Sequence, residues 1–360
     1  MLVRLDETYS QTMPVTRERR ALRVFGVSRS LPDRGCCATD RYSRWRQPEQ
    51  TVTRGLGGPK KSPYSGQVKL AGKFAWPSEF VLLDGGLATE LEARGHDLSD
   101  PLWSAKLLRD NPQAIAEVHA AYFRAGATVA TTASYQASFE GFASHGIGRD
   151  EAAGLLRRSV ELARKARDEA EAENCSVAAS IGPYGAALAD GSEYRGRYGL
   201  SVAALARWHR PRLEILAETG ADVLALETVP DVDEAEALVN LVRSVGVPAW
   251  LSYTIDGDRT RAGQPLAEAF AVAAGIDEIV AIGVNCCAPD DVLPAIRIAD
   301  IGKPIIVYPN SGERWDGRAW TGESRFSARL AREWAAAGAR IVGGCCRVGP
   351  ADIAAIAGDR

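Results

Sequence analysis

The stretch "NPQAIAEVHAAYFRAGATVATTAS", residues 111–134, joins a helical pattern to a strand pattern without a break. In its first part, apolar residues recur every three to four positions, which is the spacing of a helix with one buried face. Gly126 stands where that pattern stops, as expected for the residue that ends a helix. The run of small and β-branched residues that follows, over residues 128–134, predicts a strand.

The same unit recurs along most of the chain, and "TGAD" and "AGAR" likewise lead a helix directly into a strand. Strands are predicted over residues 80–84, 128–134, 176–182, 222–228, 249–254, 279–285, 304–309 and 339–344. Eight strands alternating with helices over about 280 residues indicate a (β/α)8 TIM barrel, which we assign to residues 76–360. The competing doubly wound sheet is less favoured, because "DGGLATE" after the first strand lacks the G-x-G-x-x-G spacing.

The composition agrees with a globular enzyme. Of the 360 residues, 46% are hydrophobic and 25% are charged, which is typical of globular domains. No apolar run approaches the roughly 20 residues of a membrane helix, so we expect no membrane partner. Seven cysteines, an odd number, and the lack of a visible secretory signal predict a reducing, cytoplasmic location.

Residues 1–75 differ from the rest, with a charge balance of +9 against −12 for the remainder. This segment is rich in arginine and has no sustained apolar period, so we predict a disordered extension. A nucleic-acid-binding arm and a twin-arginine signal are less favoured, the latter because no apolar region follows. We therefore expect no nucleic-acid partner. Deletion of residues 1–75 should leave the activity and the melting temperature nearly unchanged, which activity assays and thermal denaturation will check.

Polar and reactive residues stand where the predicted strands end. In a TIM barrel, the carboxyl ends of the strands and the loops after them form the active site. The residues of interest at these ends are Asp84, Gly85, Tyr135, Glu227, Ser252, Asn285, Cys286, Cys345 and Cys346. Their gathering at one end of the barrel indicates a catalytic or binding site there.

Two cysteine pairs, in "GVNCCAP" and "GGCCRVGP", follow the sixth and eighth strands. Only the seventh strand separates these two, so Cys286 and the Cys345–Cys346 pair can meet at one point. Three thiolates predict a zinc site, and three protein ligands leave one position open, as in catalytic zinc sites. We expect Gly343–Gly344 to permit the turn and Cys287 to point away. Buried cysteines that merely pack as small hydrophobic residues are the alternative.

The body of the chain resembles the homocysteine S-methyltransferase family, over about residues 78–358. The stretches that carry the resemblance are "DGGLATELEARG", "DPLWSAKLL", "AGATVATTASYQASFEGF", "SIGPYGAALADGSEYRG", "ALETVPD", "GVNCCAP", "VYPNSGE" and "GGCCRVGPADIAAI". The likeness is greatest to the short enzymes that use S-methylmethionine. Thr228 replaces the aromatic residue of the betaine-using branch, which argues against betaine as the methyl donor.

The resemblance implies roles for individual residues. The zinc ligands of the family match Cys286, Cys345 and Cys346. The acidic residues that hold the amino group of homocysteine match Asp84 and Glu227, and the backbone at Gly85 lies near the same substrate. We add Tyr135, Ser252 and Asn285 to the predicted substrate-binding set.

The expected reaction is zinc-dependent methyl transfer from a sulfonium donor, S-methylmethionine or S-adenosylmethionine, to the thiol of homocysteine, which gives methionine. A free thiol has a pKa near 8.5, and zinc makes it a thiolate at neutral pH. A selenocysteine or another thiol as acceptor is an alternative. A barrel that stores zinc or senses oxidants without catalysis is another, although such a protein would not need Asp84 and Glu227.

Overall fold

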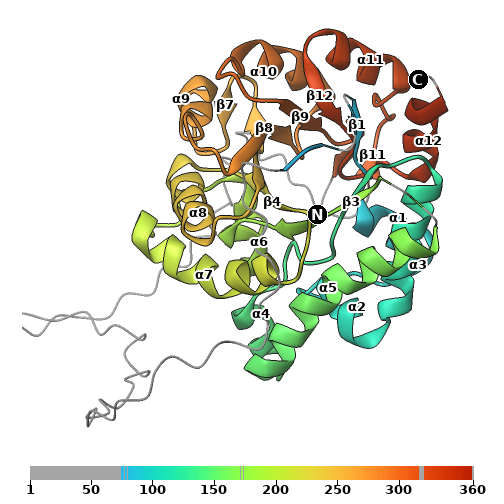
Figure 1. Cartoon of the computed structure of the whole chain (residues 1–360), viewed down its shortest axis with the longest axis vertical. Helices are drawn as coiled ribbons and strands as arrows, with labels where there is room; N and C mark the ends of the chain where they lie inside the picture. The colour runs from blue at the N-terminus through green and yellow to red at the C-terminus, as the bar shows by residue number, and fades with distance from the viewer. Residues whose placement is uncertain are drawn as a thin grey trace, which may run out of the picture. The chain divides into compact units, whose positions relative to one another are not determined.

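The computed structural model describes residues 74–358 apart from residues 77, 79, 171, 173 and 316–319. Eight parallel strands form one sheet, with helices around it (Figure 1). These strands are β1 (Val81–Leu82), β2 (Val129–Thr131), β3 (Ser176–Ile181), β4 (Val223–Val229), β5 (Ala249–Tyr253), β8 (Ile279–Asn285), β9 (Ile305–Tyr308) and β12 (Ala339–Val342). All eight predicted strands are present, and their ends differ from the predicted ones by at most three residues.

The sheet closes into a barrel. Its strand order is β1-β12-β9-β8-β5-β4-β3-β2, and a parallel bridge between Leu83 and Val129 joins the two outer strands. The backbone N–H of Asp84 donates to the carbonyl of Val129 at 3.0 Å across this seam. The predicted TIM barrel is therefore confirmed, with β9 as the one strand between β8 and β12.

The outer layer consists of helices that follow the strands. They are α1 (Leu87–Ala93), α2 (Ser104–Asp110), α3 (Pro112–Arg124), α4 (Phe139–Ser144), α5 (Arg149–Glu169), α6 (Tyr184–Leu188), α7 (Val202–Glu218), α8 (Val232–Val245), α9 (Leu266–Ala271), α10 (Val292–Ile298), α11 (Ala328–Ala336) and α12 (Pro350–Gly358). Asn111 caps α3 by accepting the N–H of Ala114, and Gly126 follows α3 with φ +96°. Only glycine adopts this conformation readily, which is why the chain turns there into β2. None of the helices in the described part of the chain is long and apolar enough to cross a membrane.

Short elements occur in the loops. These are the 3₁₀ helices η2 (Ser192–Tyr194) and η3 (Pro289–Asp291) and two small hairpins, β6 (Ile255–Asp256) with β7 (Arg259–Thr260) and β10 (Arg314–Trp315) with β11 (Trp320–Thr321). The sequence does not predict the hairpins, because two-residue strands show no alternation of polar and apolar residues.

Alternation along each strand divides the core into two layers. In β4, Val223 and Ala225 belong to the apolar cluster inside the barrel, whereas Leu224 and Leu226 belong to the cluster beneath the helices. Phe74 and Trp76 pack against the inner cluster, and the Trp76 ring lies 6.3 Å from that of Trp250 near the start of β5.

This contact bears on the predicted boundary at residue 75. Phe74 falls inside the predicted extension, yet it packs against the barrel interior. Residues 1–73 lie outside the described residues, so the predicted disorder stays a prediction. A deletion that tests it must therefore end before Phe74.

Candidate active site

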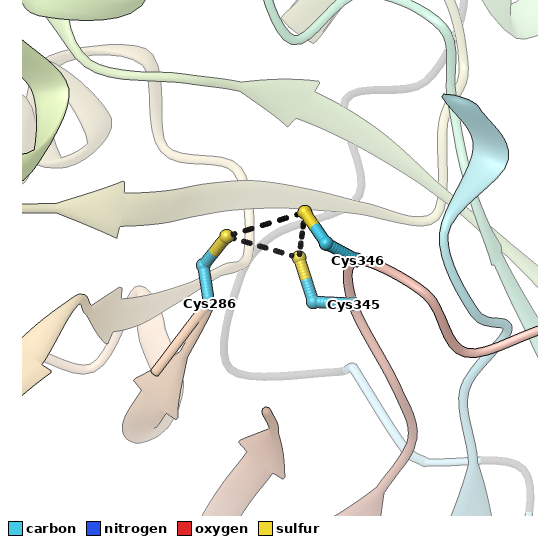
Figure 2. Close-up of side chains that lie close together, drawn as sticks. All are labelled: Cys286, Cys345 and Cys346. Carbon is cyan, nitrogen blue, oxygen red and sulfur yellow. Dashed lines mark hydrogen bonds between the residues drawn. The ribbon is translucent and has the colours of Figure 1, made fainter. Parts of the chain in front are cut away.

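Three cysteine side chains converge at the carboxyl ends of the strands (Figure 2). Cys286 directly follows β8, and Cys345 and Cys346 follow β12. The Sγ atom of Cys286 lies 3.3 Å from that of Cys345 and 3.8 Å from that of Cys346, and the last two lie 3.9 Å apart. Two adjacent cysteines thus contribute to the same cluster, as predicted.

This spacing suits a single metal ion. A tetrahedral zinc with Zn–S bonds of about 2.3 Å places its sulfur ligands about 3.8 Å apart. A disulfide requires about 2.05 Å, and all three cysteines are free. Hydrogen bonds from Cys286 and Cys345 lower the pKa of Cys346, whereas the hydrogen bonds that Cys345 makes with Cys286 and Cys346 raise the pKa of Cys345.

The backbone around the cysteines is unusual. Cys286 has φ +51° and Arg347, after the pair, has φ +66°. Such conformations cost non-glycine residues about 1–3 kcal/mol and are concentrated at functional sites. The carbonyl of Cys286 accepts a hydrogen bond from the Thr254 hydroxyl at 3.1 Å, and its N–H donates to the carbonyl of Tyr308 at 3.2 Å. These bonds hold the strained residue in place.

Gly343 and Gly344 were expected to permit a sharp turn of the backbone, but the structure gives a different reason for them. Neither glycine has a positive φ. A Cβ atom at residue 343 would lie 2.5 Å from that of Leu83, and one at residue 344 would lie 2.2 Å from a methyl group of Val348. The glycines are needed because neighbouring segments approach the backbone closely, and the turn itself falls at Arg347.

Cys287 is not part of the cluster. Its side chain is fully buried and belongs to the apolar core that also contains Val292 and Val307. Burial raises the pKa of this thiol. Its surroundings are those of a small hydrophobic residue.

A cavity of about 110 Å³ opens beside the thiol cluster. Of the predicted site residues, those that line it are Asp84, Gly85, Tyr135, Glu227, Cys286, Cys345 and Cys346. Residues that follow the first and the last strand of the barrel meet here, because the sheet places β1 beside β12. No lysine or arginine lines the cavity in the described part of the chain.

Two buried carboxyl groups form part of the cavity wall. Asp84 accepts hydrogen bonds from the N–H of Thr131 at 2.7 Å and from its hydroxyl at 3.0 Å. Glu227 accepts one from the Ser180 hydroxyl. Burial raises the pKa of Asp84 to about 8 and that of Glu227 to about 7, although these hydrogen bonds oppose it. Both carboxyl groups are therefore poised to gain from a cationic ligand.

Two other predicted residues, Ser252 and Asn285, do not line this cavity. The Ser252 hydroxyl lies 2.6 Å from that of Tyr308, which itself lines the cavity. Asn285 accepts the N–H of Thr228 and donates to its hydroxyl, each at 2.7 Å. Thr228 has φ +58°, which is rare for a β-branched residue. Ser252 and Asn285 thus support residues of the wall from behind.

Replacing Asn285 with alanine should destabilise the protein. The change leaves the buried N–H of Thr228 without an acceptor, and such a group costs about 1–3 kcal/mol. It also releases a strained residue next to Glu227. Denaturant unfolding will measure the loss. Thr228→Val is the matched control, because it removes the hydroxyl contact and keeps the backbone bond; an equal loss in both variants would contradict this explanation.

Two residues that the sequence did not single out also lie at the site. The hydroxyl of Tyr194 lies 3.2 Å from the Sγ atom of Cys286, and Tyr194 lines the cavity. Glu193, beside it in η2, is 7% exposed, and burial raises its pKa to about 7. Both belong to the "GSEYRG" segment between β3 and α7. In the sequence, only the two glycines that flank this segment and the charged residues between them could have pointed to Glu193 and Tyr194.

Comparison with known proteins agrees with this site. The family model "Homocysteine S-methyltransferase" matches residues 81–359. The homocysteine S-methyltransferase of Escherichia coli K12 is 49% identical over 77% of this chain and 94% of its own length. Homocysteine S-methyltransferase 1 of Arabidopsis thaliana is 43% identical over 78% of this chain and 93% of its own length.

Solved structures give the same answer. The crystal structure of the homocysteine methyltransferase MmuM from Escherichia coli in its metallated form is 47% identical. It superposes with a TM-score of 0.72 and covers 79% of this chain and 97% of its own. The barrel, the converging thiols and these relatives together lead to one conclusion: the chain belongs to the homocysteine S-methyltransferase family.

Proposed function

We propose that this protein transfers a methyl group from a sulfonium donor to the thiol of L-homocysteine, with Zn²⁺ held by Cys286, Cys345 and Cys346. The observation that carries the proposal is a single cavity with three thiols at one end and two buried carboxyl groups in its wall. Homocysteine carries a thiol and an ammonium group, and the two features of the cavity match these two groups.

Zinc is the metal that the donor set favours. Soft thiolate ligands select zinc over calcium and magnesium, and three of them leave one coordination position for a substrate. When bound, Zn²⁺ keeps a substrate thiol deprotonated at neutral pH, where a free thiol is mostly protonated. The five described cysteines are all free, which suits a reducing compartment such as the cytoplasm.

The carboxyl groups of Asp84 and Glu227 hold the ammonium group of homocysteine. Thr131 bonds both oxygen atoms of Asp84, and Ser180 bonds one oxygen atom of Glu227, so both carboxyl groups are oriented before the substrate arrives. A bound ammonium offsets the cost of ionising these buried carboxyl groups. Gly85 lets the backbone beside Asp84 pass close to the Val348 segment, since a Cβ atom there would lie 2.3 Å from the carbonyl oxygen of Val348.

The remaining wall includes four aromatic residues, Trp103, Tyr135, Tyr194 and Tyr308. Tyr135 and Tyr308 line the cavity and can face a cationic donor. Tyr184 does not line this cavity and packs against Tyr198 and Trp208. In the reaction, a C–S bond forms to homocysteine, and the C–S bond of the donor breaks with its electron pair remaining on the departing neutral thioether. No protein group needs to donate a proton to that product.

An assay for methionine tests the proposal. Purified protein with zinc and homocysteine is given S-methylmethionine or S-adenosylmethionine, and metal content is measured on the same sample. Methionine formation with about one zinc ion per chain is expected. A zinc-loaded protein that forms no methionine with either donor would refute the proposed reaction, and selenocysteine as acceptor would then be tested.

A further inference from the structure

A second cavity, of about 500 Å³, adjoins the first. The two share Ala88, Thr89, Trp103 and Cys346 in their walls. One of the three thiols of the cluster therefore faces both spaces. A molecule in the second cavity can reach the reacting sulfur from a side that homocysteine does not occupy.

Two side chains in the wall of the second cavity each carry a buried oxygen atom without a hydrogen-bond partner among the described residues. These are Oε2 of Glu193 and Oε1 of Gln136. Each side chain is only 7% exposed, and Gln136 uses its amide nitrogen to donate to the carbonyl of Ala186 at 2.9 Å. Buried acceptors are nearly always paired, so two such side chains in one cavity wall indicate a ligand that donates hydrogen bonds and toward which their oxygen atoms can turn.

The charge of the wall indicates what kind of donor. Four carboxyl groups, those of Glu92, Asp97, Asp100 and Glu193, line the cavity, and no described lysine or arginine does. Asp100 is paired with Lys106 and His145, each at 3.1 Å, and Asp97 accepts the N–H of Ser99. Glu193 is the buried carboxyl group with an unused oxygen, which suits a cationic ligand.

We propose that the second cavity seats the methyl donor and that Glu193 and Gln136 accept hydrogen bonds from its α-ammonium group. The inference rests on the proposed function, because only a methyl transferase needs a second substrate here. A sulfonium amino acid has the required form: its sulfonium end points to Cys346 and the first cavity, and its ammonium end draws the oxygen atoms of Glu193 and Gln136 toward it. Asp84 and Glu227 then serve homocysteine alone.

Glu193→Gln tests this assignment by steady-state kinetics on the zinc-loaded enzyme. The KM for S-methylmethionine should rise at least about tenfold, the effect of losing a charge-assisted hydrogen bond, while the KM for homocysteine stays within about twofold. Gln136→Met is the second variant and should raise the same constant by a smaller factor. Glu92→Gln, on the exposed rim of the cavity, is the matched control for charge loss and should have a weaker, salt-screened effect.

A deaminated donor separates the ammonium contact from a general effect of charge. 4-(Dimethylsulfonio)butanoate, used as a competitive inhibitor, should bind wild type and Glu193→Gln with the same inhibition constant. An unchanged donor KM in Glu193→Gln, or an equal loss of affinity for the deaminated compound, would overturn the inference. If wild type itself forms no methionine, the proposed function fails first, so the two failures are distinguishable.

Discussion

Cys345→Ala and Cys286→Ala proteins should retain less than about a tenth of a zinc ion per chain and no measurable methyl transfer. Each change removes one of three converging thiols, whose sulfur atoms lie 3.3–3.9 Å apart. Loss of a residue that merely supports a metal ligand lowers affinity about 10- to 100-fold, so loss of a ligand should exceed that. Metal analysis and a methionine assay measure the two effects.

Cys287→Ala is the control for this experiment. It is the same substitution at the next residue, in a side chain that is fully buried in the apolar core. We expect normal zinc content and activity, with a loss of stability of about 1 kcal/mol. Equal loss of zinc from Cys287→Ala and Cys286→Ala would show that the cluster is assigned to the wrong thiol. A wild-type protein that binds no metal under reducing conditions would contradict the zinc site altogether.

The strands and the thiol cluster were predictable because the sequence repeats a strand–helix unit eight times. β-Branched runs between amphipathic helices define the barrel, and barrel closure then fixes that residues after β8 and β12 meet. The resemblance to the homocysteine S-methyltransferase family is confirmed by relatives of 43–49% identity. The hydrophobic periodicity of each segment is consistent with the closed barrel, which is why the fold prediction succeeded.

The remainder depends on contacts that no local pattern encodes. Asn285 was predicted to bind substrate because it ends a strand. In the structure it does not line the cavity, and its amide bonds with Thr228, whose positive φ a sequence does not reveal. Tyr194 reaches Cys286 from a long loop, and loop paths follow from packing instead of periodicity. Glu193 is buried by the same path, so its unpaired oxygen is visible only in three dimensions.

Glu227→Gln should raise the KM for homocysteine about ten- to a hundredfold while zinc content stays at one per chain. A charge-assisted hydrogen bond is worth roughly 1.5–3 kcal/mol, and Gln keeps the shape but not the charge. 4-Mercaptobutanoate, which is homocysteine without its amino group, should bind both proteins alike. Unchanged homocysteine kinetics in both Glu227→Gln and Asp84→Asn would show that the ammonium is held elsewhere.

The same variant should be more stable than wild type at alkaline pH, because the buried carboxyl group is costly to ionise. Burial raises the pKa of Glu227 from 4.5 to about 7 in the folded protein. Between these values the native state binds more protons than the unfolded state, so the free energy of unfolding falls as the pH rises through this window. The Glu227→Gln protein does not show this fall in the free energy of unfolding, because glutamine does not titrate. The melting temperatures of the ligand-free proteins should therefore differ little near pH 4.5 and should favour Glu227→Gln above pH 7. A lower melting temperature for Glu227→Gln at pH 8 would mean that the carboxylate stabilises the ligand-free protein. That result would contradict the proposal that the ionised form of Glu227 becomes favourable only when a cation binds.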